Sequence, residues 1–238
     1  MEKIKIGYIP ALVWGEKSDK VLLCVHGQGG SKDEAAVVAD EALPLGWQVL
    51  AFDLPEHGER RDGIPLEPWH VEPELRAVMA YARARWPLIG LYANSIGAWF
   101  SMLTWPEKAL ERCLFVSPVV DMSALIRTMM SWAGVDEDRL RREQTIPTSF
   151  GQTLSWPYFQ WTMDHPVTMW AAPTSILYGG QDAMIARADV EAFAARFHGK
   201  LTVMEDGEHW FHTDEQMRVL RHWLRQELTA GKPNGTEG

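Results

Sequence analysis

Three side chains that could share one reaction follow apolar, strand-like runs: Ser95, Asp182 and His209, in that order along the 238-residue chain. A serine hydroxyl is a weak nucleophile at neutral pH and needs a neighbouring base to take its proton as it attacks. Histidine suits that task because its ordinary pKa lies at about 6.5. A buried carboxylate holds the imidazole in the useful tautomer and stabilises the cation that forms. The residue types therefore indicate covalent catalysis by a serine.

These side chains must be positioned by a regular framework, and the chain alternates segments typical of strands and helices. Because the carboxyl ends of parallel strands meet at one edge of a sheet, residues that follow the strands can come together there. Continuous apolar strands separated by helices predict an α/β fold, with a mostly parallel twisted sheet, helices on both faces and one domain over 1–238. A hairpin over 3–14 is expected at one edge of the sheet. The predicted strands span 20–27, 46–55, 87–93, 112–120, 174–180 and 200–206, and the predicted helices span 31–43, 72–86, 95–105, 188–199 and 214–228.

One segment, at about 121–171, interrupts the alternation and is too long for a connecting loop. It contains two helix-like stretches, 123–133 and 136–143, followed by a region with several prolines, and we interpret it as a small helical cap inserted into the domain. The segment is also rich in tryptophan and methionine. These residues usually serve packing, but they also offer the adaptable apolar surface that a substrate-covering lid needs. A flexible tail is expected at about 229–238. The residues predicted to line a substrate pocket are Met130, Trp132, Trp156, Trp161 and, outside the cap, Trp210.

The segment 93–97, Ala-Asn-Ser-Ile-Gly, joins a predicted strand to a predicted helix and carries Ser95 at its centre. It resembles the nucleophile elbow of the α/β-hydrolase superfamily, a sharp turn that exposes a serine, although alanine stands at the first position in place of glycine. With the segment 26–30, His-Gly-Gln-Gly-Gly, and the later aspartate and histidine, the resemblance extends over almost the whole chain. It implies that the backbone N–H groups of Gln28 and Ile96 form an oxyanion hole.

Two other residues could take the roles given to Asp182 and His209. His212 lies close to His209 in the sequence, but His209 follows a glycine turn as the superfamily's histidine does and is preferred. Asp121 follows an earlier predicted strand, where some members of the superfamily carry the acid. Asp182 ends a Tyr-Gly-Gly-Gln-Asp segment that fits better and is the first choice. His26 is expected to support the oxyanion loop.

The composition argues against several classes of partner. A net charge of −9 and the absence of a Lys/Arg run argue against nucleic acid or an anionic membrane. Cys24 and Cys113 lie in apolar runs and are expected to be buried free thiols. No metal-ligand spacing, phosphate loop or dinucleotide fingerprint occurs, so no metal or cofactor is predicted. The sequence has no signal-peptide core and no apolar run of about 20 residues, which predicts a cytoplasmic protein.

Together these features predict a cytoplasmic serine hydrolase. The expected substrates are small to medium carboxylic esters with an apolar or aromatic part, cleaved through an acyl-enzyme. Thioesters, amides, lactones and carbon–carbon bonds stay open as alternatives because a fold does not dictate a function. A ligand-binding protein with an idle triad is the alternative from a different class. The Trp- and Met-rich surface could also serve as a partner interface, as in a homodimer.

Overall fold

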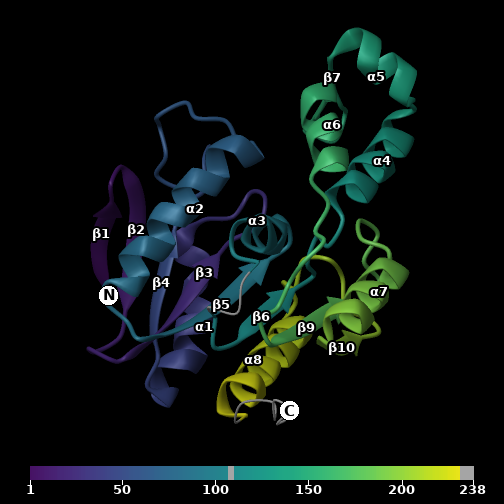
Figure 1. Cartoon of the computed structure of the whole chain (residues 1–238). Helices are drawn as coiled ribbons and strands as arrows, with labels where there is room; N and C mark the ends of the chain where they lie inside the picture. The colour runs from purple at the N-terminus through teal and green to yellow at the C-terminus, as the bar shows by residue number, and fades with distance from the viewer. Residues whose placement is uncertain (107–109, 231–238) are drawn as a thin grey trace.

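The computed structural model describes residues 1–106 and 110–230, and its centre is an eight-stranded twisted sheet (Figure 1). The second strand, β2, pairs antiparallel with both of its neighbours, and the remaining strands run parallel. The expected hairpin is the pair β1–β2 at one edge. The prediction of an α/β fold with a mostly parallel sheet is confirmed. In spatial order the strands are β1 (Glu2–Ile6), β2 (Ile9–Trp14), β4 (Gln48–Phe52), β3 (Lys20–Val25), β5 (Leu88–Asn94), β6 (Cys113–Val116), β9 (Thr174–Gly179) and β10 (Lys200–Met204).

The central strands bury apolar side chains on both faces of the sheet. In β3, Val21, Leu23 and Val25 belong to one hydrophobic cluster, whereas Leu22 and Cys24 belong to the other. Successive side chains of a strand point to opposite faces, so this alternation assigns one cluster to each face. A strand covered on both sides carries no polar stripe, and this is why the parallel strands appear in the sequence as continuous apolar runs.

Helices cover both faces of this sheet (Figure 1). Helices α1 and α8 contact each other and pack on one face, while α2, α3 and α7 pack on the other. The helix expected over 31–43 is α-helical only in its centre, because the 3-10 segments η1 and η2 flank α1. The bounds are η1 (Lys32–Ala35), α1 (Ala36–Ala42), η2 (Leu43–Leu45), α2 (Pro68–Arg83), α3 (Ile96–Thr104), α7 (Arg187–Phe197) and α8 (Asp214–Thr229).

The segment predicted to be a cap forms a projection above the sheet, at the top of Figure 1. It contains the two expected helices and, beyond them, a small two-stranded sheet and a third helix that the sequence did not predict. Pro157 is compatible with that helix because it lies in its first turn, where no N–H donor is needed. The elements are α4 (Met122–Ala133), α5 (Glu137–Glu143), β7 (Thr145–Pro147), β8 (Thr153–Ser155) and α6 (Trp156–Asp164).

Four aromatic rings join the cap to the body of the protein. Trp161 and Tyr158 of α6 lie with their ring centroids 6.0 and 6.1 Å from Trp99 of α3, and each lies 6.3 Å from Trp69 of α2. Tilted and edge-to-face pairs at such separations contribute beyond the apolar area that they bury. At least part of the cap's tryptophan content therefore serves packing.

The C-terminal helix continues into the segment expected to be a flexible tail. Thr229 is the last residue of α8, and the part of that prediction beyond Ala230 lies outside the described residues. Among the helices of the described residues, none is both long and apolar enough to cross a lipid bilayer.

Candidate active site

Ser95 occupies a sharp turn between β5, which ends at Asn94, and α3, which begins at Ile96. Its backbone angles are φ 50° and ψ −121°, a region that residues other than glycine rarely adopt. Such a conformation costs about 1–3 kcal/mol and persists only where the surrounding structure enforces it. Here the amide of Ser95 donates to the carbonyl of Val116, and the carbonyl of Ser95 accepts from the amides of Ala98 and Val119. The turn is thus held on both sides.

Gly97 is required by the close packing of this turn against β3. A Cβ atom on Gly97 would lie 2.5 Å from the carbonyl oxygen of His26 and 2.6 Å from that of Val25. Backbone atoms cannot move aside as a flexible side chain can, so a larger residue would displace the helix from the strand. By contrast, Ala93 is fully buried in β5, where its methyl group is accommodated.

The structure brings Ser95, His209 and Asp182 into one chain of hydrogen bonds. Oγ of Ser95 lies 2.9 Å from Nε2 of His209, and Nδ1 of His209 lies 2.6 Å from Oδ2 of Asp182. The hydroxyl is buried, the imidazole is 18 % exposed and the carboxylate is inaccessible to solvent. In this arrangement the Nδ1–H of the imidazole donates to the carboxylate, which leaves Nε2 free to accept the serine proton.

The second oxygen of Asp182 fixes the carboxylate in place. Oδ1 accepts hydrogen bonds from the amides of Met184 at 2.8 Å and Ile185 at 3.0 Å. Gly179 lets the loop that carries Asp182 approach the loop that carries His209, since a Cβ on Gly179 would lie 2.3 Å from the carbonyl oxygen of Glu208. The glycine at the end of β9 therefore allows the acid and the base to meet.

The two alternative residues lie elsewhere in hydrogen-bonded roles of their own. Asp121 caps the N-terminus of α4, where its Oδ1 accepts from the amide of Ala124 at 3.0 Å. His212 stacks on Trp210 with ring centroids 4.6 Å apart, and its Nδ1 lies 2.8 Å from the carbonyl oxygen of Trp210. In the described part of the chain, neither side chain contacts Ser95 or His209 through a hydrogen bond. The geometry thus favours the first choices.

The amides predicted to form an oxyanion hole lie at two unsatisfied positions of the backbone. Ile96 is the first residue of α3, and the N–H groups of a first helical turn have no partner inside the helix. Gln28 lies in the turn after β3, and within the described residues its amide donates no hydrogen bond. This turn is held from both ends: the amide of Gly30 donates to the carbonyl of Gly27, and the amide of Gly29 donates to Nε2 of His57.

Two histidines brace this turn. Nδ1 of His57 lies 2.7 Å from the carbonyl oxygen of Pro55, so the proton is on Nδ1 and Nε2 can accept from Gly29. His26 uses the same tautomer, with Nδ1 2.8 Å from the carbonyl oxygen of Gly27 and Nε2 accepting from the amide of Leu54. Burial disfavours the charged imidazolium and lowers the pKa of His26 to about 4. His26 thus has the structural role expected from the sequence.

This depressed pKa predicts a loss of stability in mild acid. Between pH 6.5 and 4 the unfolded chain takes up a proton at His26 that the folded protein does not, so the free energy of unfolding falls as the pH falls, by up to about 3 kcal/mol. Urea unfolding of the wild type and of His26→Gln across this window measures the effect. The glutamine amide can still donate and accept but does not titrate. Equal pH slopes for the two proteins would contradict the prediction.

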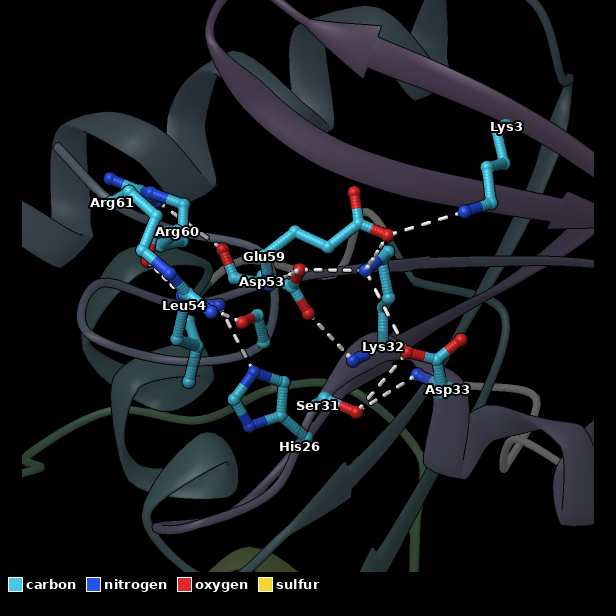
Figure 2. A network of polar contacts seen from close by, with 11 residues as sticks. Lys3, His26, Ser31, Lys32, Asp33, Asp53, Leu54, Glu59, Arg60 and Arg61 are labelled. Carbon is cyan, nitrogen blue, oxygen red and sulfur yellow. Dashed lines mark hydrogen bonds and ion pairs between the residues drawn. The ribbon is translucent and has the colours of Figure 1, made fainter.

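A buried ion pair fixes the loop after β4 to η1 (Figure 2). Nζ of Lys32 lies 2.8 Å from Oδ2 of Asp53, and the two side chains are 2 % and 0 % exposed. Burial disfavours the ammonium ion, but the hydrogen bond and charge of Asp53 outweigh it and raise the pKa of Lys32. Asp53 also accepts from the amides of Lys32 and Glu59, so its carboxylate is fully hydrogen-bonded. Arg60 of the same loop forms a second buried, bidentate pair with Glu74 of α2.

Removing one partner of the Lys32–Asp53 pair is expected to destabilise the fold strongly. Lys32→Met leaves the buried carboxylate without its cation, a change that typically costs about 3–5 kcal/mol. Lys3→Met is the matched control, because Lys3 also pairs with an acid, Glu59 at 3.4 Å, but is 71 % exposed. That exposed pair should contribute no more than about 1 kcal/mol. Urea unfolding of both variants measures the difference, and equal losses would refute the assigned role of the buried pair.

Ser95 and His209 line a cavity of about 390 Å³. Its walls come from the turn 27–30, Glu34, Asn94 and Met184, together with Trp210, one of the predicted pocket residues. The four predicted residues of the cap do not line it. Their positions are given by their neighbours: Met130 is buried in the core, Trp132 packs on Phe150, Trp156 on Phe159, and Trp161 on Trp99 and His165.

Two features of this site could not be anticipated from residue types. Lys32 and Glu34 follow a helix-capping serine, a context in which charged side chains usually face solvent. Lys32 is buried instead, and Glu34 is exposed but lines the catalytic cavity. Asp53 lies near the end of the predicted strand 46–55, which is the only signal that the sequence offers for it. No group of ligating side chains suited to a metal ion occurs within 1–106 and 110–230. Burial raises the pKa of the thiols of Cys24 and Cys113, which are free cysteines.

Comparison with known proteins shows what fold this site is built on. No protein-family model and no curated protein sequence matches the chain. Among solved structures, Est1E from Butyrivibrio proteoclasticus with bound ferulic acid is 17 % identical, with a TM-score of 0.79 over 96 % of this chain and 98 % of that one. The mouse alpha/beta hydrolase domain-containing protein 10 is 10 % identical, with a TM-score of 0.77 over 95 % and 97 %. The Pyrococcus furiosus esterase Pf2001 is 18 % identical, with a TM-score of 0.68 over 92 % and 85 %. The chain therefore has the α/β-hydrolase fold, as the resemblance in its sequence implied.

Proposed function

We propose that this protein is a serine hydrolase that cleaves carboxylic esters, with Ser95 as nucleophile, His209 as general base and Asp182 as the acid that orients it. The proposal rests on one observation above all, the unbroken chain of hydrogen bonds from the Ser95 hydroxyl to a buried carboxylate. A serine N-capping an ordinary helix would need neither the strained backbone nor the imidazole at its hydroxyl.

The reaction follows from this geometry in two halves. Oγ of Ser95 attacks the ester carbonyl carbon while its proton passes to Nε2 of His209, and the carbonyl oxygen becomes an oxyanion. The amides of Gln28 and Ile96 donate to that oxyanion, each contributing roughly 3–4 kcal/mol to the barrier reduction. The imidazolium then protonates the leaving alkoxide, which leaves an acyl group on Ser95. Water, deprotonated by the same imidazole, releases the acid and restores the hydroxyl.

We further propose small to medium esters with an apolar or aromatic part as substrates. A cavity of about 390 Å³ suits a molecule of that size, and Met184 and Trp210 supply apolar wall. The similar Est1E binds ferulic acid, an aromatic carboxylic acid, which supports an aromatic acyl group here. The cytoplasmic location, the lack of a cofactor and a homodimer formed through the Trp- and Met-rich surface stay predictions from the sequence.

Reaction with a fluorophosphonate probe and hydrolysis of p-nitrophenyl esters of graded chain length test the proposal together. We expect one probe molecule to be bound per chain and turnover to stop in step with labelling. A folded protein that neither reacts with the probe nor hydrolyses any ester would be a ligand-binding protein with an idle triad, and the proposal would fail. Hydrolysis of thioesters or amides in preference to esters would correct the substrate class alone.

A further inference from the structure

One carboxylate in the catalytic cavity has no part in the proposed reaction. Glu34 belongs to η1 and lines the same cavity as Ser95 and His209. A Cβ atom on Gly30 would lie 2.7 Å from Oε2 of Glu34, so this carboxylate lies against the turn that carries Gln28. Within the described residues, it forms no hydrogen bond and no ion pair.

The position of this charge makes the hydrolysis of a neutral ester less favourable than that of a cationic one. Negative charge develops on the substrate oxygen beside Gln28, and a second negative charge nearby repels it. Glu34 is exposed to solvent, and the partial desolvation of its carboxyl raises its pKa. Among the described residues that line the cavity, none is a lysine or arginine that could neutralise the carboxylate. A cationic group on the substrate would supply the positive charge that the cavity lacks.

Trp210 supplies a second group with the same chemical preference. Its side chain is 67 % exposed, lines the cavity and is stacked against His212, so its exposed indole surface is open to a ligand. The face of an aromatic ring attracts an ammonium ion that lies within about 6 Å of the ring centroid. An unpaired carboxylate and an exposed indole in one cavity form the combination that binds alkylammonium groups.

We infer that the cavity selects esters that carry a cationic ammonium group, with Glu34 and Trp210 as the residues that determine this specificity. The inference rests on the proposed function and adds to it the charge of the substrate. The ammonium group binds at the carboxylate and reduces its repulsion of the oxyanion. The transition state of a cationic ester is thereby stabilised, whereas that of a neutral ester of the same shape is not.

A pair of esters that differ only in charge tests the inference: butyrylcholine and 3,3-dimethylbutyl butyrate, in which carbon replaces the ammonium nitrogen. We expect kcat/KM of the wild type to favour the choline ester by about 10-fold or more. Glu34→Gln should bring that ratio close to 1, by lowering kcat/KM for the choline ester and leaving or raising it for the neutral ester. Trp210→Leu should also lower the ratio. Release of acid at constant pH measures the reactions of all three proteins with both esters in the same way.

Asp138→Asn is the matched control, because it makes the same change in net charge on the cap, where the side chain is 79 % exposed. It should leave the ratio unchanged. An unchanged ratio in Glu34→Gln, with the neutral ester still hydrolysed and the probe still bound at Ser95, would overturn this inference and leave the proposed function intact. No hydrolysis of either ester by a folded, unlabelled wild type would overturn both.

Discussion

Ser95→Ala is expected to lower kcat for a p-nitrophenyl ester by about 10⁶-fold while the protein remains folded. The substitution removes the only atom that the mechanism makes covalent, and the donors of the oxyanion hole stay in place. Alanine must adopt the same φ of 50° that serine tolerates, so the backbone strain is carried over and not relieved. The free energy of unfolding should therefore change little. Initial rates and urea unfolding, measured on the same preparations, separate the two effects.

Ser123→Ala is the control for this comparison. This substitution removes a comparable hydrogen bond, which the Ser123 hydroxyl donates to Oδ1 of Asp121 at 2.8 Å. Ser123 lies at the start of α4, away from the cavity. It should keep its full activity. If Ser95→Ala retained more than about one hundredth of the wild-type rate, the hydroxyl of Ser95 would not be the nucleophile and the proposed mechanism would be wrong.

Asp182→Asn should lower kcat by about 10⁴-fold, the second largest effect that we expect. The reason is the direction of the hydrogen bonds around this residue. Its Oδ1 accepts from the amides of Met184 and Ile185, so the oxygen of the new amide is held there and the NH₂ group faces His209. Nδ1 of the imidazole must then accept, which moves the proton to Nε2. A protonated Nε2 cannot take the proton of Ser95.

Asp121→Asn serves as the counterpart because Asp121 was the alternative choice for the acid. Asparagine is as good an N-cap as aspartate, so α4 should keep its start and the enzyme its rate. kcat measured for both variants with one ester decides the assignment. An inactive Asp121→Asn beside a nearly fully active Asp182→Asn would transfer the role of the acid to Asp121.

The parts of this structure that could be predicted from sequence are those governed by local pattern. Apolar runs such as 20–27 and 174–180 are strands because a parallel sheet buries both of its faces, and that condition leaves a continuous apolar signature. The residues that follow those strands then share one edge of the sheet. This rule, together with the resemblance to the α/β-hydrolase superfamily, selected Ser95, Asp182 and His209, and the structure places the three side chains within hydrogen-bonding distance in series.

What the sequence did not predict depends on contacts between distant segments. The burial of Lys32 follows from its meeting with Asp53, and nothing in the local sequence distinguishes this lysine from an exposed one. The substrate pocket was assigned to the tryptophans of the cap by residue type, yet the ring of Trp161 packs on Trp99 and does not line the cavity. Glu34 lies in the first turn of the predicted helix 31–43, and the local pattern gives no sign that its carboxylate lines the catalytic cavity.

The central claim is that an acyl group is transferred to Ser95 during turnover, and trapping of that intermediate tests it most directly. The protein is mixed with p-nitrophenyl butyrate, quenched in acid within the first turnovers, digested and analysed by mass spectrometry. We predict a butyryl group on the peptide that contains Ser95. In Asp182→Asn this group should form faster than it is hydrolysed, and in Ser95→Ala it should be absent. Rapid hydrolysis with an acyl group on a different residue, or with full activity and no adduct in Ser95→Ala, would contradict the account.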